Sequence, residues 1–510
     1  MRHGRPCGVD VEGEIRVSRW SERIYIVNYL GALLAAVGAL MLIPLVPLEI
    51  YGETVELRAF LEPALVCVAV GLLVQKRVPF RTPDVRDAMV ITGLGWLLVC
   101  LAGAWPFVLG LGKGWVDAFF ESVSGFTTTG ITVFEGLDTM PRCILFWRSL
   151  IQWLGGLGIL TFFLAVSFRG GGAAATLFGA EGHKISSARP APGIFHTLKI
   201  LWAIYIAITV TSGLLFWAAG MDLFDAVNHC LTCVSTGGFS THDQSTGYYL
   251  ARGVGWGRWI EWLTVVFMAM GGANFLIHYR VARGEWRALV KDFEMRWYWG
   301  IGFGAAALVY FDHVRVYGWP SGLQAFHDQV RAAVFQVVSM LTSTGYATLD
   351  INDAFFPALA KQVFLVLMVV GGCVGSTAGG IKCMRVGILA RMVRTEIFRI
   401  QRPRRVVSPV VAAGRVLDDR EIHRIAALVF AWLALIVLGA GVTAAFSSLS
   451  AWQALSGMAS AVGNMGPFYF SVHTMAGLHP VIKLTYCLGM LAGRLEILPV
   501  FVLFSRSTWR

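Results

Sequence analysis

The chain has 510 residues, of which 56% are hydrophobic and 14% are charged, and its mean hydropathy is +0.64. Because many apolar runs reach the roughly 20 residues that cross a bilayer, this composition excludes a set of soluble domains and predicts an all-α integral membrane protein. The positive residues behind the net charge of +11 lie mostly in loops on one side, so we interpret them as setting membrane topology. We expect membrane lipid as a partner and no nucleic acid.

The N-terminal part of the chain is predicted to contain a tail and a helical hairpin. Residues 1–23 carry five arginines, and no short apolar core with a cleavage site follows them, so we expect a cytoplasmic tail rather than a signal peptide. Apolar runs at 24–48 and 60–74 then predict a transmembrane hairpin, which a basic linker extends to give a unit over 24–87.

After this hairpin, one arrangement recurs four times: an apolar span, a short amphipathic run, a glycine segment and a second apolar span. The repeating units are predicted at 88–180, 181–292, 293–410 and 411–510. Their spans are predicted at 88–111 and 144–167, 195–219 and 259–278, 297–314 and 364–393, and 422–445 and 482–504. Repetition of one long element at a near-constant interval indicates a repeat architecture.

The glycine segments are the chemically informative part of each unit. The first ends the stretch DAFFESVSGFTTTGIT, and the glycines of the four segments are separated by 107, 108 and 121 positions. A short helix that runs into an extended glycine segment between two spans is how a backbone-carbonyl ion filter is built, since glycine lets carbonyl groups point inward. Four copies predict four tandem membrane-pore-membrane repeats around a central pore. The predicted ion-binding residues are Thr128, Thr129, Gly130, Ser235, Thr236, Gly237, Ser343, Thr344, Gly345, Asn464, Met465 and Gly466.

Loop charges predict the orientation of the chain. The loops next to the glycine segments are acidic or neutral, whereas Arg280, Arg283, Arg287 and Lys291, and later six arginines within 391–405, lie in the opposite loops. The positive-inside rule therefore places the glycine segments outside and both termini in the cytoplasm.

The last span of the third unit is interrupted by the run GGCVGSTAGGIK at 371–382. Glycine at this density does not hold a regular helix, and irregular backbone at membrane depth is tolerated only beside protein or water. We therefore predict a gating loop, with close packing of small residues as the alternative. A nucleotide-binding loop is disfavoured because Ile381 separates Gly380 from Lys382. The predicted gating residues are Gly371, Gly372, Gly375, Ser376, Thr377, Gly379, Gly380 and Lys382, joined by Arg494.

Arg494 is placed in this group because a charge inside a predicted span is costly and usually faces protein or water. It is predicted either to oppose cations below the glycine segments, or to snorkel to the membrane surface or form an interhelical ion pair. Arg148 and Gln152, four residues apart, are interpreted as structural ties.

The runs SGFTTTGITV, FWRSLIQWLGGLGI, GGCVGSTAGGIK and AGRLEI resemble the Trk/Ktr/HKT superfamily of cation transporters, and most closely its TrkH-type potassium uptake subunits. The resemblance implies four units around one pore, a homodimer, and a cytosolic nucleotide-binding regulatory subunit of the TrkA type. It maps filter glycines to Gly130, Gly237, Gly345 and Gly466, the gating loop to 371–382 and a pore-facing arginine to Arg494. By the same resemblance, glycine in all four segments is the potassium-type pattern, and in the fourth segment Asn464 and Met465 replace the usual hydroxyl residues.

These observations predict potassium uptake across a bacterial inner membrane, with K⁺ as the transported ion, no cofactor and no catalytic residues. Two alternatives are an ion-coupled secondary transporter with discontinuous helices and a less selective monovalent cation channel. An integral-membrane enzyme is disfavoured, because the spans carry no convergent set of His, Asp or Glu residues.

Overall fold

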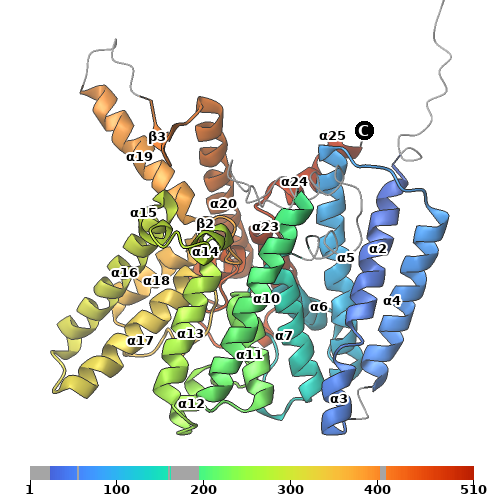
Figure 1. Cartoon of the computed structure of the whole chain (residues 1–510), viewed down its shortest axis with the longest axis horizontal. Coiled ribbons are helices and arrows are strands. Elements are labelled where there is room, and N and C mark those ends of the chain that lie inside the picture. The colour runs from blue at the N-terminus through green and yellow to red at the C-terminus, as the bar shows by residue number, and fades with distance from the viewer. Residues whose placement is uncertain (1–22, 54–56, 159–160, 162–193, 402–408, 510) are drawn as a thin grey trace, which may run out of the picture.

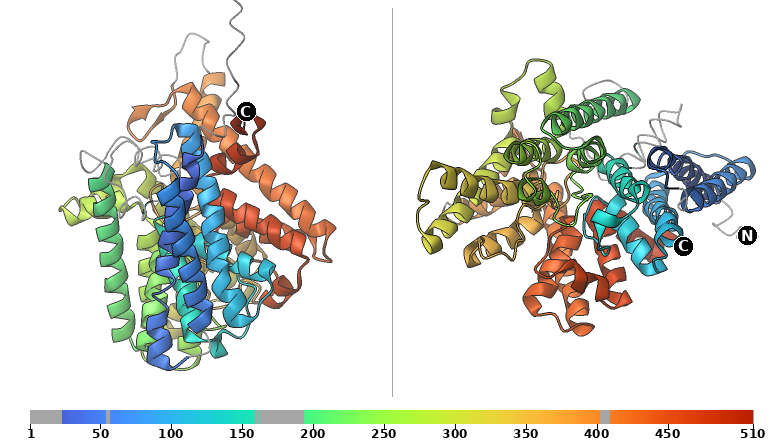
Figure 2. Two further views of the ribbon diagram at one scale, coloured as in Figure 1. Left: turned by 90° about the vertical axis from the view of Figure 1, so that its right-hand side faces the viewer. Right: turned by 90° about the horizontal axis from the view of Figure 1, so that it is seen from below.

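The computed structural model describes residues 23–53, 57–158, 161, 194–401 and 409–509, and these are mostly helical (Figure 1). The helices run between two ends of the molecule, with β3 and α25 toward one end and α3 and α12 at the other. Seen from the α12 end, the chain advances around a common centre as the colour changes from blue to red (Figure 2). Of the tail predicted at 1–23, residues 1–22 lie outside the described residues.

The first three helices are α2 (Tyr25–Leu40), α3 (Leu45–Tyr51) and α4 (Leu57–Arg77). A side-chain carbon at Gly71 would overlap the backbone of Gly31, and one at Gly38 would lie 2.8 Å from the Cβ of Cys67. α2 and α4 therefore pack with their backbones close together, as membrane helices with small residues do. The predicted span at 24–48 is divided by a turn at Pro44 into α2 and α3.

Helices of very different lengths make up most of the rest of the chain. The part up to residue 291 contains α5 (Val85–Leu111), α6 (Trp115–Phe126), η2 (Leu137–Thr139), α7 (Arg142–Gly156), α10 (Ile194–Ala218), α11 (Leu223–Val234), α12 (Gly247–Ala251), α13 (Gly257–Gly272), α14 (Phe275–Ala282) and α15 (Ala288–Lys291). Next come α16 (Phe293–Tyr317), α17 (Leu323–Leu341), α18 (Ala358–Val369), β1 (Val370–Gly371), β2 (Ile381–Lys382) and α19 (Cys383–Ile400). The final part contains β3 (Val411–Ala412), β4 (Arg415–Val416), α20 (Asp419–Ala445), α21 (Ala451–Gly463), α22 (Val472–Gly477), α23 (Pro480–Arg494), α24 (Leu498–Phe504) and α25 (Arg506–Trp509).

Local sequence explains where several of these helices begin. Asp84, Asp222 and Asp292 each accept a hydrogen bond from the first turn of the helix that follows, and Ser450 forms a capping box with Gln453. Such caps satisfy backbone N–H groups that have no partner within the helix.

Within the described residues, five helices are long and apolar enough to cross a membrane by length and composition. α13 and α14 would form a sixth span across a bend of 103°. The outer surface of α20 exposes large apolar side chains, among them Phe430 and Leu438 at 75% and 70% exposure, which is expected of a helix that faces lipid.

Several predicted spans are discontinuous. The interruption predicted within 364–393 is confirmed, since α18 and α19 are separated by the irregular loop 372–380 and by β1 and β2, which pair in parallel. The predicted continuous spans at 259–278 and 482–504 are wrong. Asn274 caps α14 and so starts a new helix after α13, while positive φ angles at Glu496 and Ile497 (54° and 70°) end α23. α7 ends at Gly156, and most of the predicted remainder to 167 lies outside the described residues.

Candidate functional site

The four helices α6, α11, α17 and α21, which are buried at their C-terminal ends, finish in the same backbone structure. Each is followed by a residue in the left-handed region, whose N–H group donates to the carbonyl three residues earlier, while the next N–H donates to the carbonyl five residues earlier. This is a Schellman motif, which satisfies carbonyl groups at the end of a helix. The left-handed residues are Thr128 (φ 55°), Thr236 (φ 52°), Ser343 (φ 52°) and Asn464 (φ 52°).

None of these residues is glycine, and threonine is especially disfavoured in the left-handed region because it is β-branched. Strained conformations of this kind are retained where the surrounding structure fixes them, and they cluster at functional sites. Two positions further on, each segment has a glycine that also has a positive φ angle. We call these segments the glycine turns; they comprise residues 127–130, 235–238, 342–345 and 463–466.

In the second glycine turn, the residues equivalent to those of the first turn lie one position later than the spacing of the glycines predicted. Thr236 has the backbone conformation of Thr128, and the glycine with positive φ is Gly238 (φ 76°), not Gly237. The N–H of Gly237 donates to Thr232 O at 2.9 Å, as the N–H of Thr129 does to Ser124 O. The structural equivalent of Gly130 is therefore Gly238, and Ser235 is displaced by one position from the place that the sequence predicted.

The four glycine turns form a closed ring. A side-chain carbon at Gly130 would overlap the carbonyl oxygen of Gly237 in the second turn, and one at Gly466 would lie 3.1 Å from the carbonyl oxygen of Thr129 in the first turn. The other two glycines make the same approach, Gly238 to Thr344 O and Gly345 to Met465 O. Each turn thus packs against the next in chain order, and the last packs against the first.

This ring explains why glycine is needed at these four positions. The positive φ angle disfavours any other residue, and a Cβ atom would in addition collide with, or press closely on, a neighbouring carbonyl group. The predicted ion-binding residues of all four segments are therefore brought together by the fold.

Polar side chains at the ring are buried and differ among the turns. The hydroxyl groups of Thr129 and Thr344 each lie 2.7 Å from the hydroxyl of the residue two positions earlier in the same turn. Asn464 instead links two units, because its Nδ2 donates to Thr129 Oγ1 and to Met490 O, both at 2.9 Å. Thr128 Oγ1 is buried and has no hydrogen-bond partner among the described residues.

Side chains of α7 hold the second turn against the first. Gln152 Nε2 donates to Gly237 O at 2.7 Å, while Gln152 Oε1 accepts from Phe239 N at 3.0 Å. Arg148 forms a fully buried ion pair with Glu121 of α6 at 2.8 Å. The geometry agrees with the interpretation of Arg148 and Gln152 as structural ties, but no pattern in the sequence indicated that Glu121 is the partner of Arg148.

Glycines on the neighbouring helices α7, α13 and α23 allow close approach to the backbone beside the ring. A side-chain carbon at Gly155 on α7 would overlap Phe126 O, and one at Gly493 on α23 would overlap Val462 O. On α13, Gly271 makes the same approach, at 2.8 Å, to Val234 O. These glycines allow the backbones of the longer helices to reach the ends of the short helices.

The glycine-rich segment 371–382 lies directly against the ring. Thr377 Oγ1 accepts from Thr236 Oγ1 of the second turn at 3.0 Å, and Gly379 N donates to Ser343 Oγ of the third turn at 2.6 Å. A side-chain carbon at Gly379 would also lie 2.7 Å from Asn464 Cβ in the fourth turn. The loop therefore contacts three of the four turns.

Arg494 joins this loop to the first unit. Its Nη1 donates to Thr377 O at 2.6 Å, and its Nη2 donates to the carbonyl groups of Gly155 and Gly156 at the end of α7. Lys382 turns back into its own loop, where its ammonium group donates to Ala378 O. Two cationic groups thus lie beside the ring, held by main-chain carbonyls.

Glu294 at the start of α16 was not predicted to belong to the site. Its Oε1 accepts from Val374 N at 2.7 Å and from Met384 N at 3.2 Å, so one carboxylate oxygen is bonded to both ends of the loop. Glu294 is 2% exposed. The available sequence signal was an acidic residue close before a long uncharged run, which also fits an ordinary helix N-terminus.

Comparison with known proteins identifies the family. A family model for TrkH, described as a cation transport protein, matches residues 60–296 and 321–509. The chain belongs to the TrkH family of cation transport proteins. The resemblance inferred from the sequence is therefore confirmed.

Individual TrkH proteins match almost the whole chain. The Trk system potassium uptake protein TrkH of Escherichia coli K12 is 31% identical over 496 residues, which cover 95% of this chain and 99% of the relative. The protein of the same name from Vibrio parahaemolyticus is 32% identical over 495 residues, with the same coverage of both chains. The crystal structure of the potassium transporter TrkH from Vibrio parahaemolyticus aligns with a TM-score of 0.83 at 30% identity, covering 96% of this chain and 99% of that structure.

TrkH family membership makes this a multi-pass membrane transport protein rather than an enzyme. Within the part of the chain that the structure describes, no group of three or more His, Cys, Asp or Glu side chains is placed to hold a metal ion.

Proposed function

We propose that this TrkH family member takes up potassium across a bacterial inner membrane, through a pore lined by the four glycine turns. The closed ring of turns is the observation that carries this proposal. Because side chains are excluded at four equivalent positions, main-chain carbonyl groups from all four turns can surround one axis and replace the water shell of an ion. Potassium is the ion named for the relatives from Escherichia coli and Vibrio parahaemolyticus.

The architecture behind this ring is four tandem membrane-pore-membrane repeats, preceded by the N-terminal hairpin at 24–87. Each turn follows one of the helices α6, α11, α17 and α21, each of which lies between two other helices in the chain, and this order supports the division. The concentration of basic loops near α15 and α19 supports a cytoplasmic position for that end and for both termini.

The loop at 371–382, with Arg494, is the gate in this proposal. It occupies the position where the second, third and fourth turns meet, and Arg494 bridges it to the first unit. A guanidinium group beside the path opposes the passage of a cation electrostatically. Movement of the loop would remove both the steric and the electrostatic obstacle.

Partners follow from the family rather than from this chain alone. A homodimer and a cytosolic nucleotide-binding subunit of the TrkA type are proposed, because the relatives are named as members of a Trk system. The basic end around α15 and α19 supplies a surface for such a subunit.

The test is uptake of rubidium-86 into liposomes that hold the purified full chain, with potassium or sodium as competitor. Gly345→Ser would place a Cβ atom onto Met465 O at a φ of 86°, and we expect it to reduce discrimination between the two ions. If the difference between the binding free energies of potassium and sodium falls by about 1.4 kcal/mol, discrimination between the two ions falls about tenfold. Gly304→Ser on α16 is the matched control, because a Cβ atom there meets nothing within 4 Å. A folded Gly345→Ser protein with the discrimination of wild type would refute the filter assignment.

A less selective monovalent cation pathway is the second candidate. Asn464 and Met465 break the pattern of hydroxyl side chains, and Asn464 is hydrogen-bonded to Thr129 of the neighbouring turn. Equal competition by potassium and sodium would favour this candidate. Uptake that depends on a proton or sodium gradient would instead favour a coupled transporter, for which the bend of 103° between α13 and α14 supplies a discontinuous helix.

A further inference from the structure

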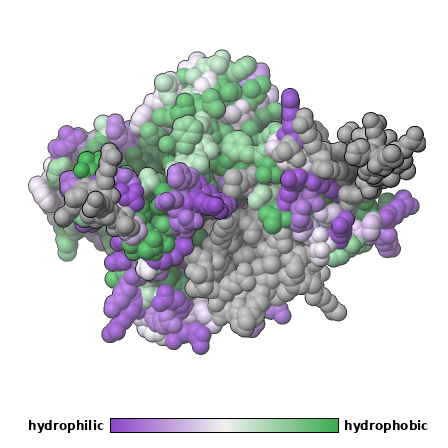
Figure 3. All heavy atoms as spheres, turned by 90° about the horizontal axis from the view of Figure 1, so that it is seen from above, coloured by the Kyte–Doolittle hydropathy of each residue, from purple (hydrophilic) through white to green (hydrophobic). Residues whose placement is uncertain are grey.

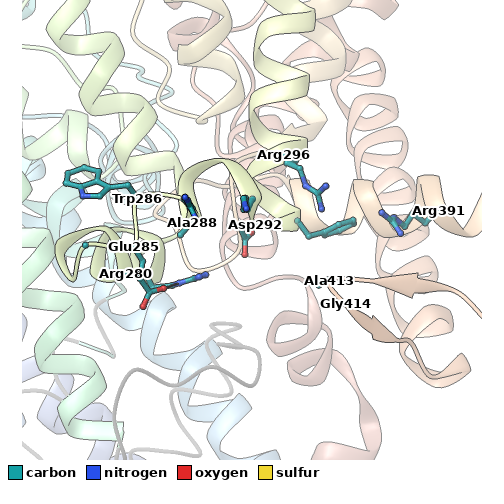
Figure 4. A pocket seen from close by; sticks show the side chains of 13 residues that line it. Arg280, Glu285, Trp286, Ala288, Asp292, Arg296, Arg391, Ala413 and Gly414 are labelled. Atoms are coloured by element: carbon teal, nitrogen blue, oxygen red, sulfur yellow. Dashed lines mark hydrogen bonds and ion pairs between the residues drawn. The ribbon is translucent and has the colours of Figure 1, made fainter.

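A cavity of about 810 Å³ opens between α15 and the turn that follows β3, on the side of the molecule away from α3 and α12. Its walls are the segment that joins α14 to α15, the first turn of α16, one side of α19 and the turn between β3 and β4 (Figure 4). In this view Arg296 and Arg391 lie on the α16 and α19 side, while Arg280 and Trp286 lie on the other side. None of these residues belongs to the ring, to the loop or to their hydrogen-bond partners.

The lining has an excess of positive charge. It includes five cationic side chains and two acidic ones, which leaves a surplus of three positive charges. Glu285 is paired with Arg280 at 2.8 Å, and the carboxylate of Asp292 accepts from the N–H groups of Glu294 and Met295 at the start of α16. Both acidic groups therefore already have partners within the protein.

Three of the cations are available to a ligand. Arg391 donates to Val411 O at 2.9 Å, but the side chains of Arg287, Lys291 and Arg296 make no hydrogen bond or ion pair with any described residue. All three are exposed and line one cavity. An anion that binds there gains their charge without breaking an existing ion pair.

The position of the cavity suggests the source of that anion. Arg296 is the last charged residue before 15 uncharged residues, 297–311, which at 1.5 Å per residue extend about 22 Å along α16. Trp286 and Val290 beside the cavity are 67% and 68% exposed. Tryptophan and basic residues at the edge of an apolar stretch are typical of the headgroup level of a membrane. From above, this end shows hydrophilic patches next to hydrophobic ones (Figure 3).

We propose that this cavity binds the phosphate group of an anionic ligand, with Arg287, Lys291 and Arg296 as the binding residues. Guanidinium groups match the geometry of phosphate oxygens through paired N–H donors, and an ammonium group adds a compact charge. The phosphate belongs either to an anionic phospholipid headgroup or to a soluble phosphorylated molecule. The exposed Trp286 and Val290 favour the lipid.

The test measures binding of fluorescently labelled phosphatidylglycerol to the purified full chain in detergent. The triple variant Arg287→Gln/Lys291→Gln/Arg296→Gln is expected to bind this lipid roughly 100-fold more weakly than wild type does. Each basic residue near an anionic lipid surface strengthens binding roughly fivefold, and the variant lacks three of them. The control triple Arg394→Gln/Arg420→Gln/Arg424→Gln removes the same charge from exposed positions outside the cavity and should bind nearly as wild type does.

Competitors distinguish the two sources of phosphate. Displacement by unlabelled phosphatidylglycerol, but not by phosphatidylcholine or inorganic phosphate, assigns the site to a lipid headgroup; displacement by inorganic phosphate as well assigns it to a phosphate group in general. Equal affinity of wild type and the cavity triple, or an equal loss in both triples, would overturn the proposal. If the cavity triple does not fold, Arg296→Gln and the charge-preserving Arg296→Lys are compared instead. Because ion flux is not measured, this result is independent of the proposed transport function.

Discussion

Replacement of Glu294 by glutamine tests whether one carboxylate on α16 keeps the glycine-rich loop closed against the ring. Glu294 Oε1 accepts from Val374 N and Met384 N, which lie on either side of the loop residues that touch the glycine turns. Glutamine keeps the length and shape of the side chain and one acceptor oxygen, but it removes the charge. The substitution therefore weakens both hydrogen bonds without creating a cavity.

The magnitude follows from the two bonds. A hydrogen bond to a charged group contributes about 1.5–3 kcal/mol and one between neutral groups about 0.5–1.5 kcal/mol, so the loss is about 1 kcal/mol for each bond. Two bonds give about 2 kcal/mol, which raises the population of the open loop roughly 30-fold. The free energy of global unfolding need not fall by the same amount, because glutamine also removes the cost of burying a charge.

The assay is hydrogen–deuterium exchange of peptides that cover 372–384, with rubidium-86 uptake measured on the same preparation. Amides of this segment should exchange faster in Glu294→Gln through local opening, and uptake should rise if the loop limits flux. Glu396→Gln on α19 is the control, because this exposed carboxylate pairs with Arg399 one turn away and, among the described residues, contacts neither the loop nor the glycine turns. Unchanged exchange in a folded Glu294→Gln protein would refute the role of Glu294, whatever the uptake. Faster exchange with unchanged uptake would instead refute the loop as the gate.

Three further predictions concern the ring and its supports. Gly238→Ala should impair ion discrimination in the rubidium uptake assay more than Gly237→Ala, because a Cβ atom at Gly238 meets a backbone carbonyl whereas one at Gly237 meets the end of a glutamine side chain; equal effects would contradict the assigned register. Glu121→Gln should lower stability by about 3–5 kcal/mol, seen as a lower midpoint of thermal unfolding, because it leaves the buried Arg148 without its carboxylate; an unchanged midpoint would show that this ion pair is not stabilising. The ring of His242 lies between the carboxylates of Asp138, at 2.6 Å, and Asp225, at 2.8 Å. Burial alone would lower the pKa of His242, but the hydrogen bonds to these two carboxylates outweigh burial and raise the pKa above 6.5. This group should therefore stabilise the fold below about pH 6.5 and lose that contribution as pH rises through the raised pKa, so the unfolding midpoint should fall with rising pH in wild type and much less in His242→Gln.

The sequence by itself determined the features that depend on neighbouring residues. Long apolar runs specified helices, because only a helix satisfies its own backbone in an apolar environment. Segments such as Thr128-Thr129-Gly130 and the run at 371–382 marked irregular backbone, because glycine permits conformations that other residues resist. The short helices before the glycine turns and the interruption between α18 and α19 were predicted on these grounds, and the structure contains both.

Only the tertiary structure decided which residues meet. Gly237 and Gly238 are adjacent, and spacing alone chose the wrong one as the equivalent of Gly130; the contact of Gly238 with Thr344 in the next turn decides the register. Likewise, Glu294 looks like an ordinary charge at the start of a helix until the fold brings Val374 and Met384, 80 and 90 residues further along, within hydrogen-bonding distance. Contacts between distant segments depend on how helices pack around the ring, and no local pattern in the chain encodes that packing.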